Sequence, residues 1–252
     1  MEPILEVSGL TRRFFARNQD SFAAVDQMSF RLFPGEKLGI VGESGCGKST
    51  LAKLLCRLID PTGGTIRLCG KDITKSRGKD LTGIYRNIQM VFQDPVASFD
   101  PRRTLGDGVG ESLRAAGVSR AEREARVREL LAQCGLNEEF SGRYPHEVSG
   151  GECQRAAIAR ALAIQPKILI CDEATSALDV TVQQQIMELL ERLGQTHELS
   201  HLFISHNLAL VQSFCDRLLV MHEGKIVEEG TLDEVILHPQ AEYTKLLIDS
   251  VL

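Results

Sequence analysis

Nine residues, Gly42–Thr50, place the strongest constraint on the fold of this chain because the first eight of them match the pattern GxxxxGK[ST]. A short apolar run, Lys37–Val41, precedes them, and leucines at helical spacing follow from Ser49 to Leu58. The sequence therefore predicts a strand, a glycine-rich loop and a helix in direct succession. Backbone N–H groups in such a loop wrap phosphate groups, and the helix N-terminus faces their charge. The residues predicted to bind phosphate are Gly42, Glu43, Ser44, Gly45, Cys46, Gly47, Lys48, Ser49 and Thr50.

The polar residues of this loop suit a nucleoside triphosphate bound together with Mg²⁺. Lys48 is predicted to reach the β- and γ-phosphates, and the Ser49 hydroxyl is predicted to hold the ion. Further along, the apolar run Lys167–Cys171 ends in two carboxylates, Asp172 and Glu173. The first suits a role on Mg²⁺, and the second suits polarisation of the attacking water. We therefore expect an ATPase in which Asp172 is a metal ligand and Glu173 is catalytic.

A second glycine-containing turn, Ser149–Glu152, begins a helix that is predicted over Glu152–Ile164. A serine hydroxyl and the free N–H groups of glycines at a helix N-terminus form an anion site. Taken alone, this pattern more often marks a turn capped by serine, so the interpretation depends on the other motifs. The residues concerned are Ser149, Gly150, Gly151 and Glu152.

Strand and helix patterns alternate along most of the chain, which predicts an α/β fold with a mostly parallel sheet. Alternating apolar residues in Ile4–Val7 and Met28–Leu32 predict an antiparallel sheet beside it. From Asp94 to Ser149 the pattern is helical. We therefore expect a single domain in which residues 1–93 and 150–252 form an α/β core with a β subdomain, and residues 94–149 form an inserted helical subdomain.

Composition argues against several classes of protein. The formal net charge of the 252 residues is -5, which argues against a nucleic-acid partner. Seven cysteines without a CxxC pair predict neither a disulfide framework nor a zinc site. The sequence shows no secretory signal and no apolar run of membrane-spanning length, so we expect any membrane to be crossed by another chain.

Further motifs occur in a recognisable order. VFQDP contains Gln93, VSGGECQR follows it, SALD includes Ser176, Ala177 and Asp179, and His206 comes after an apolar strand. With the motifs above, this set resembles the nucleotide-binding subunit of ABC transporters over nearly the whole chain. The resemblance implies a P-loop NTPase core of the RecA-like type.

The same resemblance implies particular residue roles. Gln93 would contact Mg²⁺ and the attacking water, and His206 would contact the γ-phosphate. Ser176 and Asp179 would belong to the D-loop. An aromatic residue near the N-terminus would stack on adenine, for which Phe14 is the first candidate and Phe15 the alternative.

In this family two subunits pack head to tail, so Ser149–Glu152 would contact the ATP bound by the partner. The partner is either a second copy of this chain or a sister ATPase. The signature usually has Gln where this chain has Glu152. A carboxylate in the first turn suits the helix dipole, but it repels a γ-phosphate, so we hypothesise that Glu152 weakens this half of the site.

The segment VFQDPVASFDPRRTL and, in part, the C-terminal HPQAEYTKLL resemble the oligopeptide, dipeptide and nickel importers. This implies an ATP-hydrolysing subunit for the uptake of small peptides or nickel chelates, peripheral on the cytoplasmic face of the membrane. Permease subunits would dock near Asp94–Leu105, on a surface formed by Pro95, Phe99 and Pro101. An extracytoplasmic substrate-binding protein would be an indirect partner.

Three other functions compete with this one. ABC-type DNA-repair ATPases need a long coiled coil between Gln93 and Ser149, for which the interval is too short. Translation-type ABC proteins carry two cassettes in one chain, and this chain has one set of motifs. A related ATPase subunit of a soluble enzyme complex, as in phosphonate breakdown, stays open as the alternative.

Overall fold

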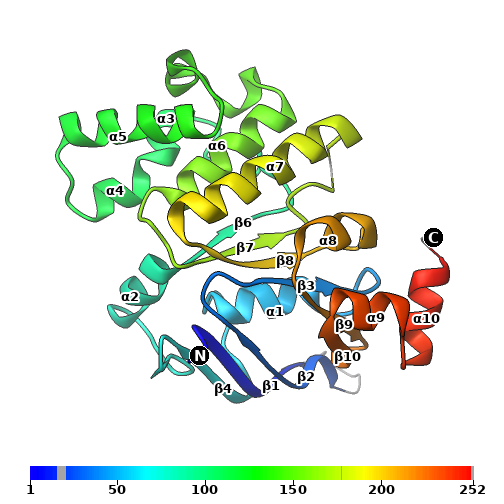
Figure 1. The fold of residues 1–252 in the computed structure, drawn as a ribbon. Coiled ribbons are helices and arrows are strands. Elements are labelled where there is room, and N and C mark those ends of the chain that lie inside the picture. Colours follow the sequence, from blue (N-terminus) through cyan, green and yellow to red (C-terminus); the bar gives the residue numbers. More distant parts are fainter. Residues whose placement is uncertain (16–20, 177, 251–252) are drawn as a thin grey trace.

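The computed structural model describes residues 1–15, 21–176 and 178–250, and its strands form two sheets in this part of the chain (Figure 1). The larger sheet has the strand order β10-β9-β3-β8-β7-β6, and its strands are parallel except β10, which pairs antiparallel with β9. These strands are β3 (Lys37–Val41), β6 (Ile88–Val91), β7 (Ile168–Asp172), β8 (Ser200–Ile204), β9 (Arg217–His222) and β10 (Lys225–Thr231).

The smaller sheet is antiparallel and has the order β2-β1-β4-β5. Its strands are β1 (Leu5–Phe14), β2 (Phe22–Leu32), β4 (Gly63–Leu68) and β5 (Lys71–Asp72). The register of β1 against β2 shifts between Val7 and Leu10 and again near Arg12. These irregularities curve the two long strands, because an extra residue on one strand bends it and increases its twist.

Both faces of the larger sheet are buried, which explains why its central strands are apolar throughout. In β7, Ile168 and Ile170 pack into one hydrophobic cluster, whereas Leu169 and Cys171 pack into the other. The first cluster contains the smaller sheet and α1 (Lys48–Leu55), and the second contains most of the remaining helices. Helix α1 therefore lies between the two sheets, as Figure 1 shows.

The other helices complete the layers around the sheets. Figure 1 shows α3 to α7 on the face of the larger sheet opposite α1, and α10 beside β10. Their bounds are α2 (Asp80–Asn87), α3 (Leu105–Val109), α4 (Glu111–Ala115), α5 (Arg120–Gln133), α6 (Gly150–Leu162), α7 (Val180–His197), α8 (Leu208–Phe214), α9 (Leu232–Leu237) and α10 (Glu242–Asp249), with short 3₁₀ turns at Glu138–Gly142 and Pro145–Glu147.

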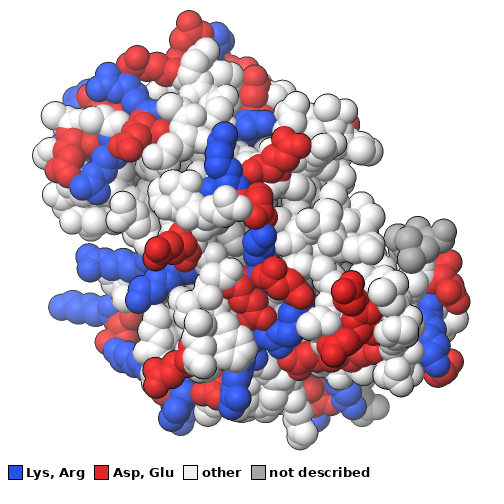
Figure 2. Space-filling view, in the orientation of Figure 1, with Lys and Arg blue, Asp and Glu red and all other residues white. Residues whose placement is uncertain are grey.

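Helix α5 buries a narrow stripe and exposes a charged surface. Val127 and Leu131 are buried, and the exposed face carries the ion pairs Arg120–Glu124 at 2.8 Å and Arg126–Glu122 at 2.7 Å. Pairs at this spacing each stabilise a helix by about 0.2–0.5 kcal/mol. Figure 2 shows positive and negative side chains interspersed over the face of the protein in view.

The predicted fold class is confirmed: a mostly parallel sheet, an antiparallel sheet and a group of helices between β6 and β7 are present. The division of the chain at residues 94 and 150 stays a prediction. Helix α1 ends at Leu55, before the expected Leu58, because Arg57 adopts a left-handed conformation with φ 56°. Helices α2, α9 and α10 were not predicted from the sequence pattern.

Candidate functional site

The glycine loop lies between β3 and α1, as predicted, and close packing requires two of its glycines, Gly42 and Gly47. Gly42, Gly45 and Gly47 all have positive φ angles, a region that side chains rarely adopt. A Cβ atom on Gly47 would lie 1.9 Å from the carbonyl oxygen of Ala24, and one on Gly42 would lie 2.1 Å from that of Met221. The loop is therefore held between β2 and β9 in a conformation that only glycine permits at these positions.

Lys48 points back over the loop. Its ammonium group donates hydrogen bonds to the carbonyl oxygens of Gly42 at 2.6 Å and Glu43 at 2.8 Å, and the side chain is 4% exposed. The thiol of Cys46 lies beside it, and burial raises the pKa of that thiol. Lys48 therefore provides the positive charge of the loop, and Cys46 stays a neutral thiol.

Asp172 and Ser49 meet at the start of α1. Ser49 Oγ donates a hydrogen bond to Asp172 Oδ1 at 3.1 Å, and Asp172 is 5% exposed at the end of β7. Burial is the main cause that raises the pKa of Asp172, and the negative charge of Glu173 adds to it. A cation at this point would relieve both effects, because an opposite charge favours the ionised carboxylate.

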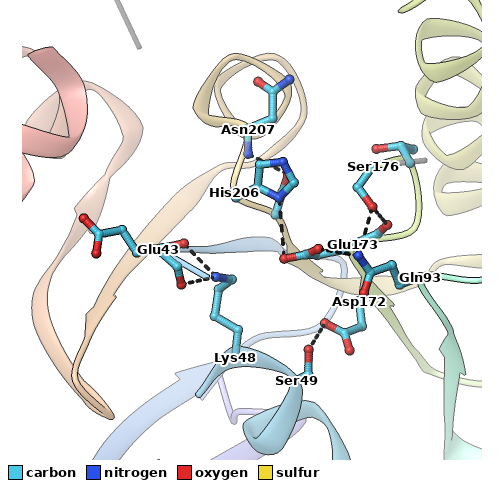
Figure 3. A network of polar contacts seen from close by, with 12 residues as sticks. Glu43, Lys48, Ser49, Gln93, Asp172, Glu173, Ser176, His206 and Asn207 are labelled. Atoms are coloured by element: carbon cyan, nitrogen blue, oxygen red, sulfur yellow. Dashed lines mark hydrogen bonds and ion pairs between the residues drawn. The ribbon is translucent and has the colours of Figure 1, made fainter. Parts of the chain in front are cut away.

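Glu173 is the centre of a network of polar side chains from three strands (Figure 3). Gln93 Nε2 donates to Glu173 Oε2 at 2.9 Å, and His206 Nδ1 lies 3.5 Å from Glu173 Oε1. Ser176 Oγ lies 3.4 Å from the same Gln93 nitrogen. Gln93 follows β6, Glu173 follows β7 and His206 follows β8. These groups meet because the carboxyl ends of neighbouring parallel strands lie at one edge of the sheet.

A pocket of about 310 Å³ joins these groups to the glycine loop. Phe14 lines this pocket, whereas Phe15 is 80% exposed and is not among the lining residues. Phe22 also lines the pocket, directly opposite Phe14 in the β1–β2 register. Sequence reasoning missed Phe22, because the pairing that brings it beside Phe14 depends on the irregular register of the two strands.

The turn Ser149–Glu152 does not line this pocket, as far as the described residues show. It begins α6, where Ser149 Oγ donates to the Glu152 carboxylate at 2.8 Å and the same carboxylate accepts from the Ser149 N–H at 2.8 Å. A Cβ atom on Gly151 would lie 2.7 Å from Val182 of α7. The structure therefore places the two predicted anion sites at different positions on one chain.

The D-loop segment leads into α7. Ser176 Oγ donates to the Glu173 carbonyl oxygen at 3.0 Å, and Asp179 caps α7 by accepting a hydrogen bond from the Val182 N–H at 3.0 Å. Ala177 lies outside the described residues. Both described residues thus connect the sheet edge that carries Glu173 to the helix against which the turn Ser149–Glu152 packs.

The surface expected at Asp94–Leu105 needs a correction. Pro95 and Phe99 are buried, and only Pro101 of the three expected residues is exposed. Phe99 is covered by the guanidinium of Arg160, whose Cζ lies 4.2 Å from the ring centroid. The expectation assumed that apolar residues in a proline-containing loop face outward. Instead, Phe92 and Val96 are the exposed apolar side chains here.

A strand, a phosphate-type loop and a helix, with an acidic pair at the end of a neighbouring strand, define the P-loop class of nucleoside triphosphatases. The sequence profile described as "ABC transporter" matches residues 25–176. The chain belongs to the ABC transporter family, as an ATP-binding subunit that hydrolyses ATP to drive transport.

Individual relatives agree with this placement. The oligopeptide transport ATP-binding protein OppF of Salmonella typhimurium is 45% identical over 242 residues, which cover 95% of this chain and 72% of OppF. The dipeptide transport ATP-binding protein DppF of Lactococcus lactis is 43% identical, with 98% of this chain and 81% of DppF covered. A dimeric post-hydrolysis structure of the ATP-binding cassette MJ0796 bound to ADP and Pi has a TM-score of 0.83 at 29% identity, covering 90% of this chain and 98% of that one.

Among residues 1–15, 21–176 and 178–250, no helix is long and apolar enough to cross a membrane.

Proposed function

We propose that this chain supplies the energy for an importer of small peptides. The observation that carries the proposal is the similarity, at 43–45% identity over nearly the whole chain, to ATP-binding proteins named for oligopeptide and dipeptide transport. The sequence motifs at Val91–Leu105 and near the C-terminus support the same branch. In this proposal the chain is peripheral on the cytoplasmic face of the membrane.

ATP binds in the pocket beside the glycine loop. The triphosphate lies along this loop, Gly42–Thr50. Lys48 exchanges its two carbonyl partners for phosphate oxygens, with which its hydrogen bonds are charge-assisted on both sides. Phe14 and Phe22 provide an aromatic surface for adenine in the lining of the pocket. Their position as directly paired residues of β1 and β2, both lining the pocket, supports this assignment.

The residues around Ser49 fit Mg²⁺. The Ser49 hydroxyl and the Asp172 carboxylate lie 3.1 Å apart and are both oxygen ligands. Such a pair suits Mg²⁺, which binds one or two protein oxygens together with substrate phosphates and water. We assign the Ser49 hydroxyl, the Asp172 carboxylate and the amide oxygen of Gln93 to it. When bound, the ion neutralises charge on the phosphates.

Hydrolysis depends on Glu173. Its carboxylate orients and polarises the attacking water, while Gln93 and His206 fix the carboxylate from two sides at 2.9 and 3.5 Å. We assign His206 to the γ-phosphate; its side chain is 55% exposed, so it is accessible to a bound nucleotide.

A second subunit completes each site. Ser149, Gly150, Gly151 and Glu152 lie outside the pocket of their own chain, so we assign them to the nucleotide bound by a partner, either a second copy or a sister ATPase. Ser176 and Asp179 lie between the two sites and connect them. Permease subunits dock on the face around Phe92 and Val96, and an extracytoplasmic binding protein delivers the peptide.

The test is reconstitution. The chain is purified from its native membrane with a mild detergent, co-purifying permeases are identified, and the complex is placed in liposomes with its binding protein. Small peptides should stimulate ATP hydrolysis and accumulate inside the vesicles. Stimulation by nickel and not by peptides would contradict the proposed cargo. Co-purification with soluble enzymes in place of permeases would contradict transport itself.

A further inference from the structure

The C-terminal helix α10 makes a direct contact with the phosphate loop. The backbone N–H of Glu43 donates a hydrogen bond to the phenol oxygen of Tyr243 at 3.0 Å. The two residues are 200 positions apart, so the tertiary fold alone creates this contact. The mechanism described above does not use Tyr243, although it touches one of the nine residues of the loop.

Tyr243 is held firmly in its position. Its ring stacks on His222 at the end of β9, with ring centroids 3.9 Å apart and an angle of 28° between the rings. The beginning of α10 is fixed by Glu228 of β10, whose carboxylate accepts hydrogen bonds from the N–H groups of Gln240 at 2.8 Å and Ala241 at 3.0 Å. The position of the phenol is therefore set by the β9–β10 hairpin.

The residue that Tyr243 contacts, Glu43, also contacts the lysine of the loop. Glu43 uses its N–H for Tyr243 and its carbonyl oxygen for the Lys48 ammonium, 2.8 Å away. On the same side, the N–H of Gly224, in the turn between β9 and β10, donates to the Cys46 carbonyl oxygen at 3.0 Å. One flank of the loop is thus fastened at two points, one to the hairpin and one to α10.

The chemistry of a phenol suits this task. Burial raises the pKa of Tyr243, so the group stays protonated and accepts the Glu43 N–H through a neutral oxygen. A carboxylate at this point would also accept the N–H, but it would place negative charge beside the phosphates. A neutral acceptor fixes the loop without that repulsion.

We propose that Tyr243 is a positioning residue that sets the affinity of the site for ATP. By fixing the backbone of Glu43, it keeps this flank of the loop in one arrangement before nucleotide arrives, which reduces the ordering needed on binding. The inference rests on the proposed role of the loop as the ATP site.

Equilibrium titration of the full chain with Mg²⁺–ATP tests this proposal by calorimetry. Tyr243→Phe keeps the ring on His222 and removes only the hydroxyl. We expect its dissociation constant to rise about 2- to 10-fold, which is the usual value of one hydrogen bond. Tyr85→Phe is the matched control, because it removes a hydroxyl from a partly buried tyrosine of α2, away from the loop; its affinity should equal that of the wild type.

Urea unfolding of each variant shows whether a change in ATP affinity is accompanied by a change in the stability of the fold. A Tyr243→Phe protein with wild-type affinity would overturn the proposal, whether or not its unfolding midpoint falls. An equal loss of affinity in Tyr85→Phe would also overturn it. Lys48→Ala tests the underlying assignment separately: if that variant binds ATP as tightly as the wild type, the loop is not the ATP site, whatever Tyr243→Phe does.

Discussion

Glu173 combines an unusual backbone conformation with a central position in the site. Its φ is 49°, in a region that costs a residue with a side chain about 1 kcal/mol or more. The backbone is held there by a hydrogen bond from its N–H to the Ile204 carbonyl oxygen at 2.9 Å. This conformation directs the carboxylate off the end of β7 to the point where Gln93 and His206 contact it.

The first prediction concerns this carboxylate. Glu173→Gln keeps the size and hydrogen-bonding capacity of the side chain but removes its ability to accept a proton from water. ATP binding should stay at the wild-type level, while single-turnover hydrolysis slows by about 10²–10⁴-fold. Glu188→Gln, on the exposed face of α7, is the control and should hydrolyse ATP normally. Hydrolysis at the wild-type rate in Glu173→Gln would refute the assigned role.

The second prediction concerns the signature turn. Glu152 holds the Ser149 hydroxyl with a full negative charge at 2.8 Å, at the surface assigned to the partner's nucleotide. Glu152→Gln can still cap the helix through its amide oxygen, but it removes the charge. In the Glu173→Gln background, this variant should dimerise at a lower ATP concentration, as measured by analytical ultracentrifugation. Glu147→Gln is the control, since Glu147 caps the Tyr144 N–H at 2.9 Å outside the signature. The same ATP dependence with Glu or Gln at position 152 would argue against the charge effect.

At the scale of elements, strands buried on both faces were the easiest to predict. The run from Lys167 to Cys171 could be assigned as a buried strand because every residue after Lys167 is apolar. The polar groups that end β6, β7 and β8 could be expected to meet, because parallel strands bring their carboxyl ends together.

Other elements were not predictable for physical reasons. Most of β1 and β2 was missed because the shifts in their register break the alternation on which strand prediction depends. Phe22 and Tyr243 were missed for a related reason, since each faces its site only through a contact between distant parts of the chain. Phe99 was placed at the surface because its cover, Arg160, comes from a helix that lies far along the sequence.

Arg160 joins α6 to the loop before α3. Its guanidinium donates to the Ser98 carbonyl oxygen at 2.6 Å and lies 2.9 Å from Ser98 Oγ, and it stacks on Phe99. Helix α6 also carries the signature turn at its other end. A single residue thus links the segment assigned to permease docking with the helix assigned to the partner's ATP.

The third prediction tests this link. Arg160→Lys keeps the charge but loses the planar fork that contacts Ser98 at two points. Hydrogen exchange of the backbone amides in residues 94–105 should become faster, with the rest of the protein unchanged. Arg155→Lys is a matched control on the same helix, because Arg155 contacts Cys134 and Gln185. Equal exchange of residues 94–105 in wild type and Arg160→Lys would show that the link is not needed to order the segment.

At the scale of the whole molecule, one buried histidine makes stability depend on pH. His201 lies in β8 with no exposed surface, and neither ring nitrogen has a hydrogen-bond partner in the part of the chain that the structure describes. Burial, with the charge of Lys37, lowers its pKa to about 4. Glu191 is the nearby group that opposes this shift. The folded protein therefore keeps the ring neutral over a pH range in which the unfolded chain protonates it.

The fourth prediction follows from linkage. Between the unfolded pKa near 6.5 and the folded value near 4, the unfolded chain binds the extra proton, so stability falls as pH falls. From pH 7 to pH 5, His201 should account for about 2 kcal/mol of lost free energy of unfolding. His201→Leu should lack this part of the pH dependence in urea titrations, and His238→Leu, at an exposed histidine, should retain it. Parallel curves for wild type and His201→Leu would contradict the prediction.

The contacts that fix the phosphate loop also determine when during synthesis the site can form. The loop is made early, but two of its fastenings, Gly224 and Tyr243, are translated near the end of the described chain. When only the first half of the nascent chain has been made, the nucleotide motif is therefore present without the groups that hold its flank. Full ATP affinity should therefore be reached only after α10 has left the exit tunnel, so unfinished chains should bind cellular ATP less tightly than the finished protein.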